Sequence, residues 1–175
     1  MFALSDWKII CLGDSITFGQ AATTAAQRYP DLLNVSAMAS GGGADGTVET
    51  VLRIDEIIAL MPKMVTLMIG GNDILFGVPA ATWKANYKLI RDRLFSAGIE
   101  VIHLLPTPRS GADQLINYIT TEAGFMLDMV IDTNTLLASG NSQTLNAMYD
   151  SGDGLHLNDV GFQKLADIIN LALGL

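Results

Sequence analysis

Cysteine is almost absent from this chain of 175 residues, and positive charge is scarce. The single cysteine, Cys11, cannot form a disulfide within the chain, so the fold does not depend on an oxidising compartment. We expect Cys11 to be a buried strand residue. Ten lysine and arginine residues stand against 18 aspartate and glutamate residues, which gives a net charge of −8. Nucleic acids and anionic membrane surfaces are bound by basic faces, so this balance argues against both partners.

Long hydrophobic runs are also absent, although half of the residues are apolar. No apolar stretch approaches the roughly 20 residues that a membrane-spanning helix needs. Residues 1–8 lack the basic start and apolar run of a signal peptide. We therefore expect a soluble protein without a membrane span, cytoplasmic, or secreted if a leader has been removed. No linker, repeat or low-complexity tract interrupts residues 1–175, which predicts a single domain.

Short apolar runs alternate along the chain with longer segments of helical periodicity. The runs that predict strands are Trp7–Leu12, Asn34–Ala39, Met64–Ile69 and Glu100–Leu105, with a weaker one near Phe125–Ile131. Helices are predicted over Thr47–Leu60, over Pro79–Ala97, and from an N-cap at Asn158 through the last apolar stripe. This alternation predicts a flavodoxin-like, doubly wound parallel sheet of about five strands in a three-layer α/β/α sandwich.

Open parallel sheets bind ligands beyond the carboxyl ends of their strands. The segments expected there hold most of the unusual glycines and isolated polar residues, and they are 13–19, 40–46, 70–76 and 106–111. Residues 149–158, before the last helix, join them if the sheet closes as predicted. The chemistry of the protein is therefore expected in these segments.

Ser15 follows the first predicted strand, in the sequence Gly13-Asp14-Ser15-Ile16. Taken alone, this segment is equally well explained as an ordinary turn. The hydrolase elbow Gly-x-Ser-x-Gly is not satisfied, because Thr17 occupies the position of the second glycine. The interpretation of Ser15 as a nucleophile therefore depends on a base elsewhere in the chain.

The chain has two histidines that can serve as that base. His103 lies inside an apolar strand, and we expect it to be a packed core residue. His156 lies in a polar loop before the final helix, three residues after Asp153. At that spacing a turn allows the carboxylate to accept a hydrogen bond from the imidazole and to stabilise its charged form. His156 is therefore the candidate base, with Asp153 as its partner.

An acyl-transfer site also needs hydrogen-bond donors for the oxyanion. Asn72 follows the third strand in the sequence Gly70-Gly71-Asn72-Asp73, and such an amide is worth about 3–4 kcal/mol of transition-state stabilisation. The segment Ser40-Gly41-Gly42-Gly43 follows the second strand and offers a backbone N–H with no side chain in the way. The Ser15 N–H is the third candidate donor.

In their order and placement, these four motifs resemble those of the SGNH (GDSL-type) serine hydrolase family. The resemblance spans essentially the whole chain, from Ser15 to the final helix, and three of the four blocks match closely. It implies that Ser15 is the nucleophile, His156 the general base and acid, and Asp153 the residue that orients His156. It also implies an oxyanion hole formed by the Ser15 N–H, a glycine N–H and the Asn72 amide.

This chain departs from the family pattern in two places. Three glycines compete in the second block, and we choose Gly41 over Gly42 because Gly41 directly follows Ser40. Leu157 replaces a proline that often follows the histidine, a change of little expected consequence.

The resemblance implies an esterase or lipase that cleaves carboxylic esters through an acyl-serine intermediate, with no cofactor and no metal. A chain this short leaves little room for lid insertions, which favours an open site and short acyl or acetyl esters. The expected partner is therefore a small-molecule ester or an acetylated carbohydrate; no particular oligomeric state is predicted. Alternatives are a thioesterase or lysophospholipase, a carbohydrate O-acetylesterase, and a non-catalytic carbohydrate-binding domain on the same fold.

Other signals carry less weight. Residues 41–46 satisfy Gly-x-Gly-x-x-Gly, which is typical of dinucleotide sites, yet they follow the second strand and no ribose-binding acid follows the next strand. No phosphate-binding loop of the form Gly-x-x-x-x-Gly-Lys-Ser/Thr occurs, and two distant histidines with one cysteine supply no zinc ligand cluster. Arg109, in the segment after the fourth strand, is expected to be a solvated loop residue.

Overall fold

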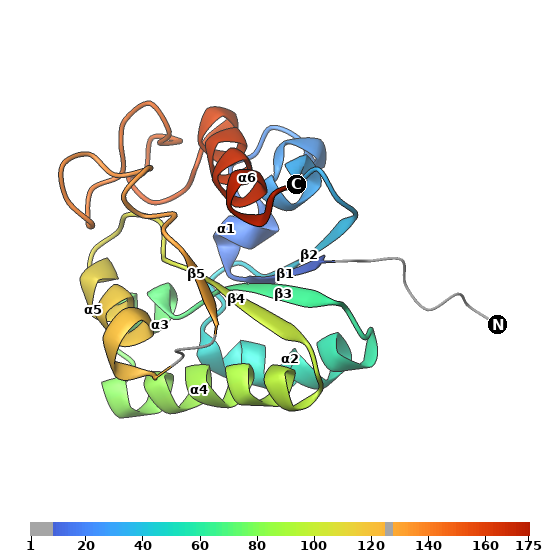
Figure 1. Cartoon of the computed structure of the whole chain (residues 1–175). Helices are drawn as coiled ribbons and strands as arrows, with labels where there is room; N and C mark the ends of the chain where they lie inside the picture. The colour runs from blue at the N-terminus through green and yellow to red at the C-terminus, as the bar shows by residue number, and fades with distance from the viewer. Residues whose placement is uncertain (1–8, 125–127) are drawn as a thin grey trace.

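The computed structural model describes residues 9–124 and 128–175, and a parallel β-sheet forms its middle layer (Figure 1). The five strands lie in the order β2-β1-β3-β4-β5. Their bounds are β1 Ile9–Gly13, β2 Ala37–Gly41, β3 Met64–Met68, β4 Glu100–Leu104 and β5 Met129–Ile131. All four pairings between neighbouring strands are parallel, which confirms the predicted sheet.

Helices cover both faces of the sheet, which confirms the three-layer α/β/α architecture (Figure 1). One face is covered by α2 (Thr47–Ala59) and α4 (Ala80–Ser96), and the other by α6 (Asp159–Leu173) together with the short α1 (Ser15–Phe18). Two further short helices, α3 (Gly71–Leu75) and α5 (Ala112–Asn117), follow β3 and β4. No helix in the part of the chain that the structure describes is long and apolar enough to cross a membrane.

Alternate strand residues supply two separate cores, one on each face of the sheet. Ile10 and Leu12 of β1 pack in the core beneath α2 and α4, whereas Ile9 and Cys11 pack in the core beneath α6. Side chains alternate between the two faces of a strand, so a strand covered on both sides is apolar throughout. Cys11 is buried as predicted, and burial raises the pKa of its thiol to about 12.

The helix limits agree closely with the sequence patterns. Asn158 is the N-cap of α6, as predicted, and its side-chain oxygen accepts a hydrogen bond from the Gly161 N–H at 2.9 Å. Pro79 precedes α4, and Gly98 follows it with a φ of +76°, a conformation that glycine adopts at little cost. The periodicity of these long helices was therefore a sound guide to their position.

The second strand is shifted from its predicted place. We predict a strand over Asn34–Ala39, but β2 begins at Ala37 and continues to Gly41. The Asn34 N–H donates instead to Oδ1 of Asn170 in α6 at 2.9 Å, so this residue is tied to the helix layer. Residues 7 and 8 of the first predicted strand, and 125–127 of the weakest one, lie outside the described residues.

His103 is a core residue of β4, as predicted, and its side chain is fully buried. Its Nε2 donates to the Asp128 carboxylate at 3.0 Å, and its Nδ1 accepts from the Tyr87 hydroxyl at 2.9 Å. Arg91 donates to both oxygens of the same carboxylate, at 2.6 and 2.7 Å. Burial lowers the pKa of His103, so this histidine is held in its neutral form.

Candidate active site

Ser15 is the first residue of α1 and directly follows the turn at the carboxyl end of β1. Asp14 is the N-cap of this helix, and its Oδ1 accepts a hydrogen bond from the Ile16 N–H at 2.9 Å. The cap holds the backbone around Ser15 in place. The side chain of Ser15 thus projects from a rigid junction between a strand and a helix.

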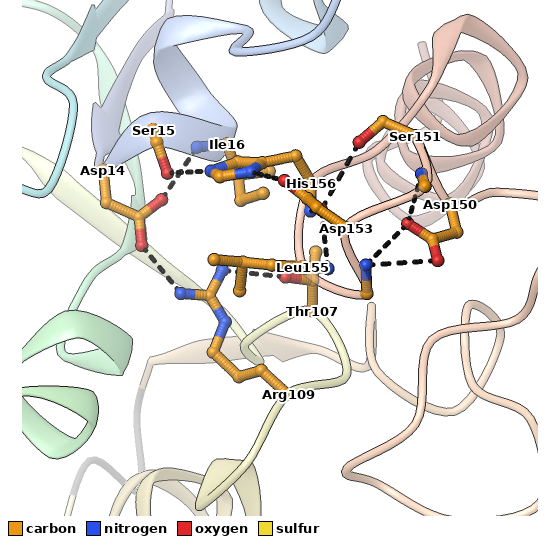
Figure 2. A network of polar contacts seen from close by, with 12 residues as sticks. Asp14, Ser15, Ile16, Thr107, Arg109, Asp150, Ser151, Asp153, Leu155 and His156 are labelled. Carbon is orange, nitrogen blue, oxygen red and sulfur yellow. Dashed lines mark hydrogen bonds and ion pairs between the residues drawn. The ribbon is translucent and has the colours of Figure 1, made fainter.

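His156 contacts Ser15 across 141 residues of sequence (Figure 2). Its Nε2 lies 3.0 Å from the Ser15 Oγ, and its Nδ1 lies 2.6 Å from Oδ2 of Asp153. The structure therefore brings together the three side chains that the sequence singled out as a triad. His103, the other histidine, lies in the core packed with α4 and takes no part in this arrangement.

Asp153 is ionised and can only accept hydrogen bonds. Burial alone would raise the pKa of Asp153, but bonds from the His156 side chain and from the His156 and Leu155 N–H groups lower it to about 2. The proton on His156 therefore lies at Nδ1, facing the carboxylate, and Nε2 is free to accept the hydroxyl proton of Ser15. This is the tautomer that a base for Ser15 needs.

The loop that carries His156 is held by its own polar groups. Asp150 accepts hydrogen bonds from the Gly152 and Gly154 N–H groups at 2.8 and 3.0 Å. Both glycines have positive φ, +111° and +73°, which side chains rarely adopt. Asn158 donates to the carbonyl groups of Met148 and Asp150, at 3.0 Å each. The glycines and acids of this segment thus shape a loop that presents His156.

Asn72 lies in the first turn of α3, at the carboxyl end of the neighbouring strand β3. Its side chain is buried, and its Nδ2 donates to the main-chain carbonyl of Asp45 at 2.8 Å. Arg53 of α2 pairs with the Asp45 carboxylate and donates to the Gly13 carbonyl at 2.9 Å. Asn72 is therefore anchored to the segment after β2, which in turn is anchored to the end of β1.

Gly41 ends β2 and lies opposite Gly13 in the register with β1. A Cβ atom at Gly41 would lie 2.5 Å from the Asp14 carbonyl oxygen and 2.5 Å from the Phe18 nitrogen. Only glycine permits this close approach of β2 to the backbone of α1. The absent side chain thus has a packing reason, and it brings the segment after β2 beside Ser15.

The start of α2 is unsuited to the dinucleotide that the Gly-x-Gly-x-x-Gly pattern suggests. A dinucleotide pyrophosphate binds to free N–H groups at a helix N-terminus. Here the Gly46 N–H donates to Glu49 at 2.8 Å, and the Thr47 N–H donates to Asp73 at 2.8 Å. Two carboxylates occupy the place of the phosphates, so the pattern reflects local packing.

Arg109 is where the sequence prediction was wrong. We expect a solvated loop arginine, but only 4% of its surface is exposed, and its Nη1 lies 3.3 Å from the Asp14 carboxylate (Figure 2). Its Nη2 donates to the Thr107 Oγ1 at 3.0 Å. Two prolines, Pro106 and Pro108, stiffen this segment, but a stiff segment does not by itself indicate that Arg109 is buried.

The comparisons with known proteins agree with this fold. The three-layer α/β/α fold is that of the SGNH hydrolases. The model of the GDSL-like lipase/acylhydrolase family matches residues 11–164. The chain therefore belongs to the GDSL-like lipase/acylhydrolase family, which places it among the hydrolases. No curated protein sequence matches it.

Three solved structures illustrate the likeness. A protein assigned to the lipolytic G-D-S-L family of Desulfitobacterium hafniense is 20% identical, with a TM-score of 0.84 over 93% of this chain and 97% of that chain. A GDSL-like lipase from Bacteroides thetaiotaomicron is 20% identical, with a TM-score of 0.78 over 95% and 87%. An acetylxylan esterase from Geobacillus stearothermophilus is 18% identical, with a TM-score of 0.78 over 98% and 95%.

Proposed function

We propose that this protein is a serine esterase that hydrolyses short-chain acyl or acetyl esters through an acyl-serine intermediate. One observation carries the proposal: the unbroken line of hydrogen-bonding distances from the Ser15 hydroxyl through His156 to Asp153, at 3.0 and 2.6 Å. A base in contact with a hydroxyl, and itself oriented by a carboxylate, is the arrangement that activates a serine nucleophile.

In the proposed reaction, the Ser15 Oγ attacks the ester carbonyl carbon while His156 Nε2 takes the hydroxyl proton. The tetrahedral intermediate collapses, the bond to the alcohol breaks, and His156 returns its proton to the leaving oxygen. A water molecule then attacks the acyl-serine as His156 accepts one of its protons. The carboxylic acid leaves and the Ser15 hydroxyl is restored, so the protein is unchanged.

The oxyanion of each tetrahedral intermediate is proposed to bind the Ser15 N–H, the Gly41 N–H and the Asn72 amide. Ser15 is the first residue of α1, and N–H groups in a first helical turn have no partner within the helix. Asn72 uses Nδ2 to contact Asp45, and an amide nitrogen carries two hydrogens. Gly41 supports the site through its close approach to α1.

The proposed substrates are small esters, with acetylated carbohydrates as the natural class. The connections after β1 and β2 are short: five residues separate β2 from α2, and β1 runs into α1 with Asp14 alone between them, whereas the longer connection over residues 132–158 carries His156. Connections as short as those after β1 and β2 leave little room for a lid of their own, which favours small substrates. The acetylxylan esterase from Geobacillus stearothermophilus shares this fold, which supports acetyl groups on a polysaccharide as one candidate.

A series of p-nitrophenyl esters from acetate to dodecanoate, together with acetylated xylooligosaccharides, tests this proposal. We expect kcat/KM to be highest for acetate or butyrate and to fall for longer chains, with Ser15→Ala as the inactive control. A maximum at long chains would favour a lipase or lysophospholipase, and faster cleavage of acyl thioesters would favour a thioesterase. Glycan binding without any turnover by the unmodified protein would establish the non-catalytic alternative.

A further inference from the structure

A buried ion pair lies directly behind the candidate nucleophile, between Asp14 and Arg109 (Figure 2). Asp14 is 2% exposed and immediately precedes Ser15. Its Oδ1 is occupied by the Ile16 N–H at 2.9 Å, and its Oδ2 faces the Arg109 Nη1 at 3.3 Å. Building on the proposed function, we propose that Arg109 is a positioning residue that neutralises Asp14 during ester cleavage.

The physical reason is the sign of the charge beside the reacting atoms. Ester attack by Ser15 places a negative charge on the carbonyl oxygen, and the Asp14 carboxylate is already negative. Asp14 and Ser15 are both buried, and like charges beside buried groups repel each other more strongly than they would in bulk solvent. Asp14 caps α1 and so holds the backbone of Ser15 in place. Without a compensating cation, its negative charge would also destabilise the negatively charged tetrahedral intermediate. Arg109 supplies the compensating charge.

The structure is built to accommodate the guanidinium at this place. A Cβ atom at Gly71 would lie 2.7 Å from the Arg109 Nη1, so the lack of a side chain there leaves room for the arginine. Gly71 directly precedes Asn72. Arg109 therefore lies against both the turn that carries Ser15 and the turn that carries Asn72. Its Nη2 is held by the Thr107 Oγ1.

Burying Arg109 costs stability, so packing alone does not explain why an arginine occupies this position. Its Nε is buried and has no hydrogen-bond partner within residues 9–124 and 128–175. A buried donor without a partner destabilises a fold, and an apolar side chain of similar volume would avoid that cost. A buried group of this kind calls for an explanation, and the neutralisation of Asp14 supplies one.

The test compares Arg109→Met, Asp14→Asn and the double variant with the unmodified protein. Turnover of p-nitrophenyl acetate is divided by the active sites counted with a fluorophosphonate, so that only folded, reactive enzyme is scored. We expect Arg109→Met to lower kcat about tenfold or more while KM changes little, because the oxyanion develops after substrate binding. Arg109→Lys, which keeps the charge, should recover part of that loss.

The double variant makes the test specific to charge. Asparagine caps a helix as well as aspartate does, so Asp14→Asn keeps the bond to Ile16 while removing the carboxylate. The two charges act on the oxyanion in opposite directions, so removing both should restore kcat from the low value of Arg109→Met to near that of the unmodified protein. A double variant with a kcat tenfold or more below that of the unmodified protein would overturn the proposal, and this comparison stands even if Arg109→Met alone does not fold.

A matched control comes from the other face of the sheet. Arg91 of α4 pairs with Asp128 through two part-buried hydrogen bonds at 2.6 and 2.7 Å. Arg91→Met should lower the melting temperature and leave kcat per active site unchanged. Full kcat per active site in Arg109→Met would make Arg109 structural, like Arg91. An unmodified protein that neither hydrolyses esters nor reacts with the fluorophosphonate would instead refute the proposed function itself.

Discussion

Asn72 Nδ2 donates to the main-chain carbonyl of Asp45 over 2.8 Å, joining the segment after β3 to the segment after β2. The Asp45 side chain is paired in turn with Arg53, which also bonds the Gly13 carbonyl at the end of β1. One hydrogen of the Asn72 amide is therefore fixed in place. The direction of the second hydrogen follows from it, because an amide group is planar.

This relationship leads to a prediction for Asn72→Ala. Loss of an oxyanion donor weakens binding of the transition state more than binding of the substrate, so kcat should fall about a hundredfold or more with a smaller change in KM. Melting temperature and kcat are to be measured on the same sample. A variant that is less stable but fully active would assign to Asn72 only the structural bond to Asp45.

Ser15→Ala should abolish ester turnover while the fold is retained. The side chain of Ser15 bonds His156 and differs from that of alanine only by its hydroxyl group, so the melting temperature should change little. The measurement is hydrolysis of p-nitrophenyl acetate, with circular dichroism as the control for folding. Near-normal turnover by Ser15→Ala, or failure of a fluorophosphonate to label Ser15, would eliminate the proposed mechanism.

His156→Ala should lower kcat by several orders of magnitude, because Ser15 then has no base. In the unmodified protein kcat/KM should fall on acidification, because only neutral His156 can accept the proton of Ser15. The pKa of Asp153 is lowered to about 2, so Asp153 stays ionised where this loss occurs. A pH series of kcat/KM checks this expectation. An unchanged rate for His156→Ala, beside an inactive but folded His103→Ala, would reverse the two assignments.

His103 should affect stability instead, with a defined pH dependence. Burial lowers its pKa below the ordinary value of 6.5, so the unfolded chain binds a proton that the native chain does not. The free energy of unfolding should therefore be full above pH 6.5 and decrease as pH falls below it. Urea unfolding at several pH values should show a shallower decrease between about pH 6.5 and 5 for His103→Gln. Parallel curves for the two proteins would contradict this.

The acidic partner of His103 titrates in a separate window. Burial alone would raise the pKa of Asp128, but hydrogen bonds from Arg91 and His103 leave it below the ordinary value of 3.8. Its contribution to stability is therefore lost only as the pH falls below that value. The change in the free energy of unfolding between about pH 6.5 and 5 therefore reports on His103 and not on Asp128.

The sequence predicted most of the longer helices and strands and the candidate triad, because local sequence patterns indicate both. Apolar runs and helical periodicity located β3, β4, α2, α4 and α6 to within one or two residues. The sequence patterns did not predict the short helices α1 and α3, because a helix of about one turn shows no periodicity. The start of β2 was misplaced because the bond from Asn34 to Asn170 joins segments 136 residues apart.

By itself, the sequence singled out the candidate site residues, since turn, cap and strand preferences depend on near neighbours. Only the tertiary structure decided which of them meet. The strand order places the ends of β1 and β3 side by side, and the loop before α6 brings His156 to 3.0 Å from Ser15. It also buried Arg109 against Asp14, 95 residues away in the chain. Burial depends on how distant segments pack, and no local pattern around Arg109 contains that information.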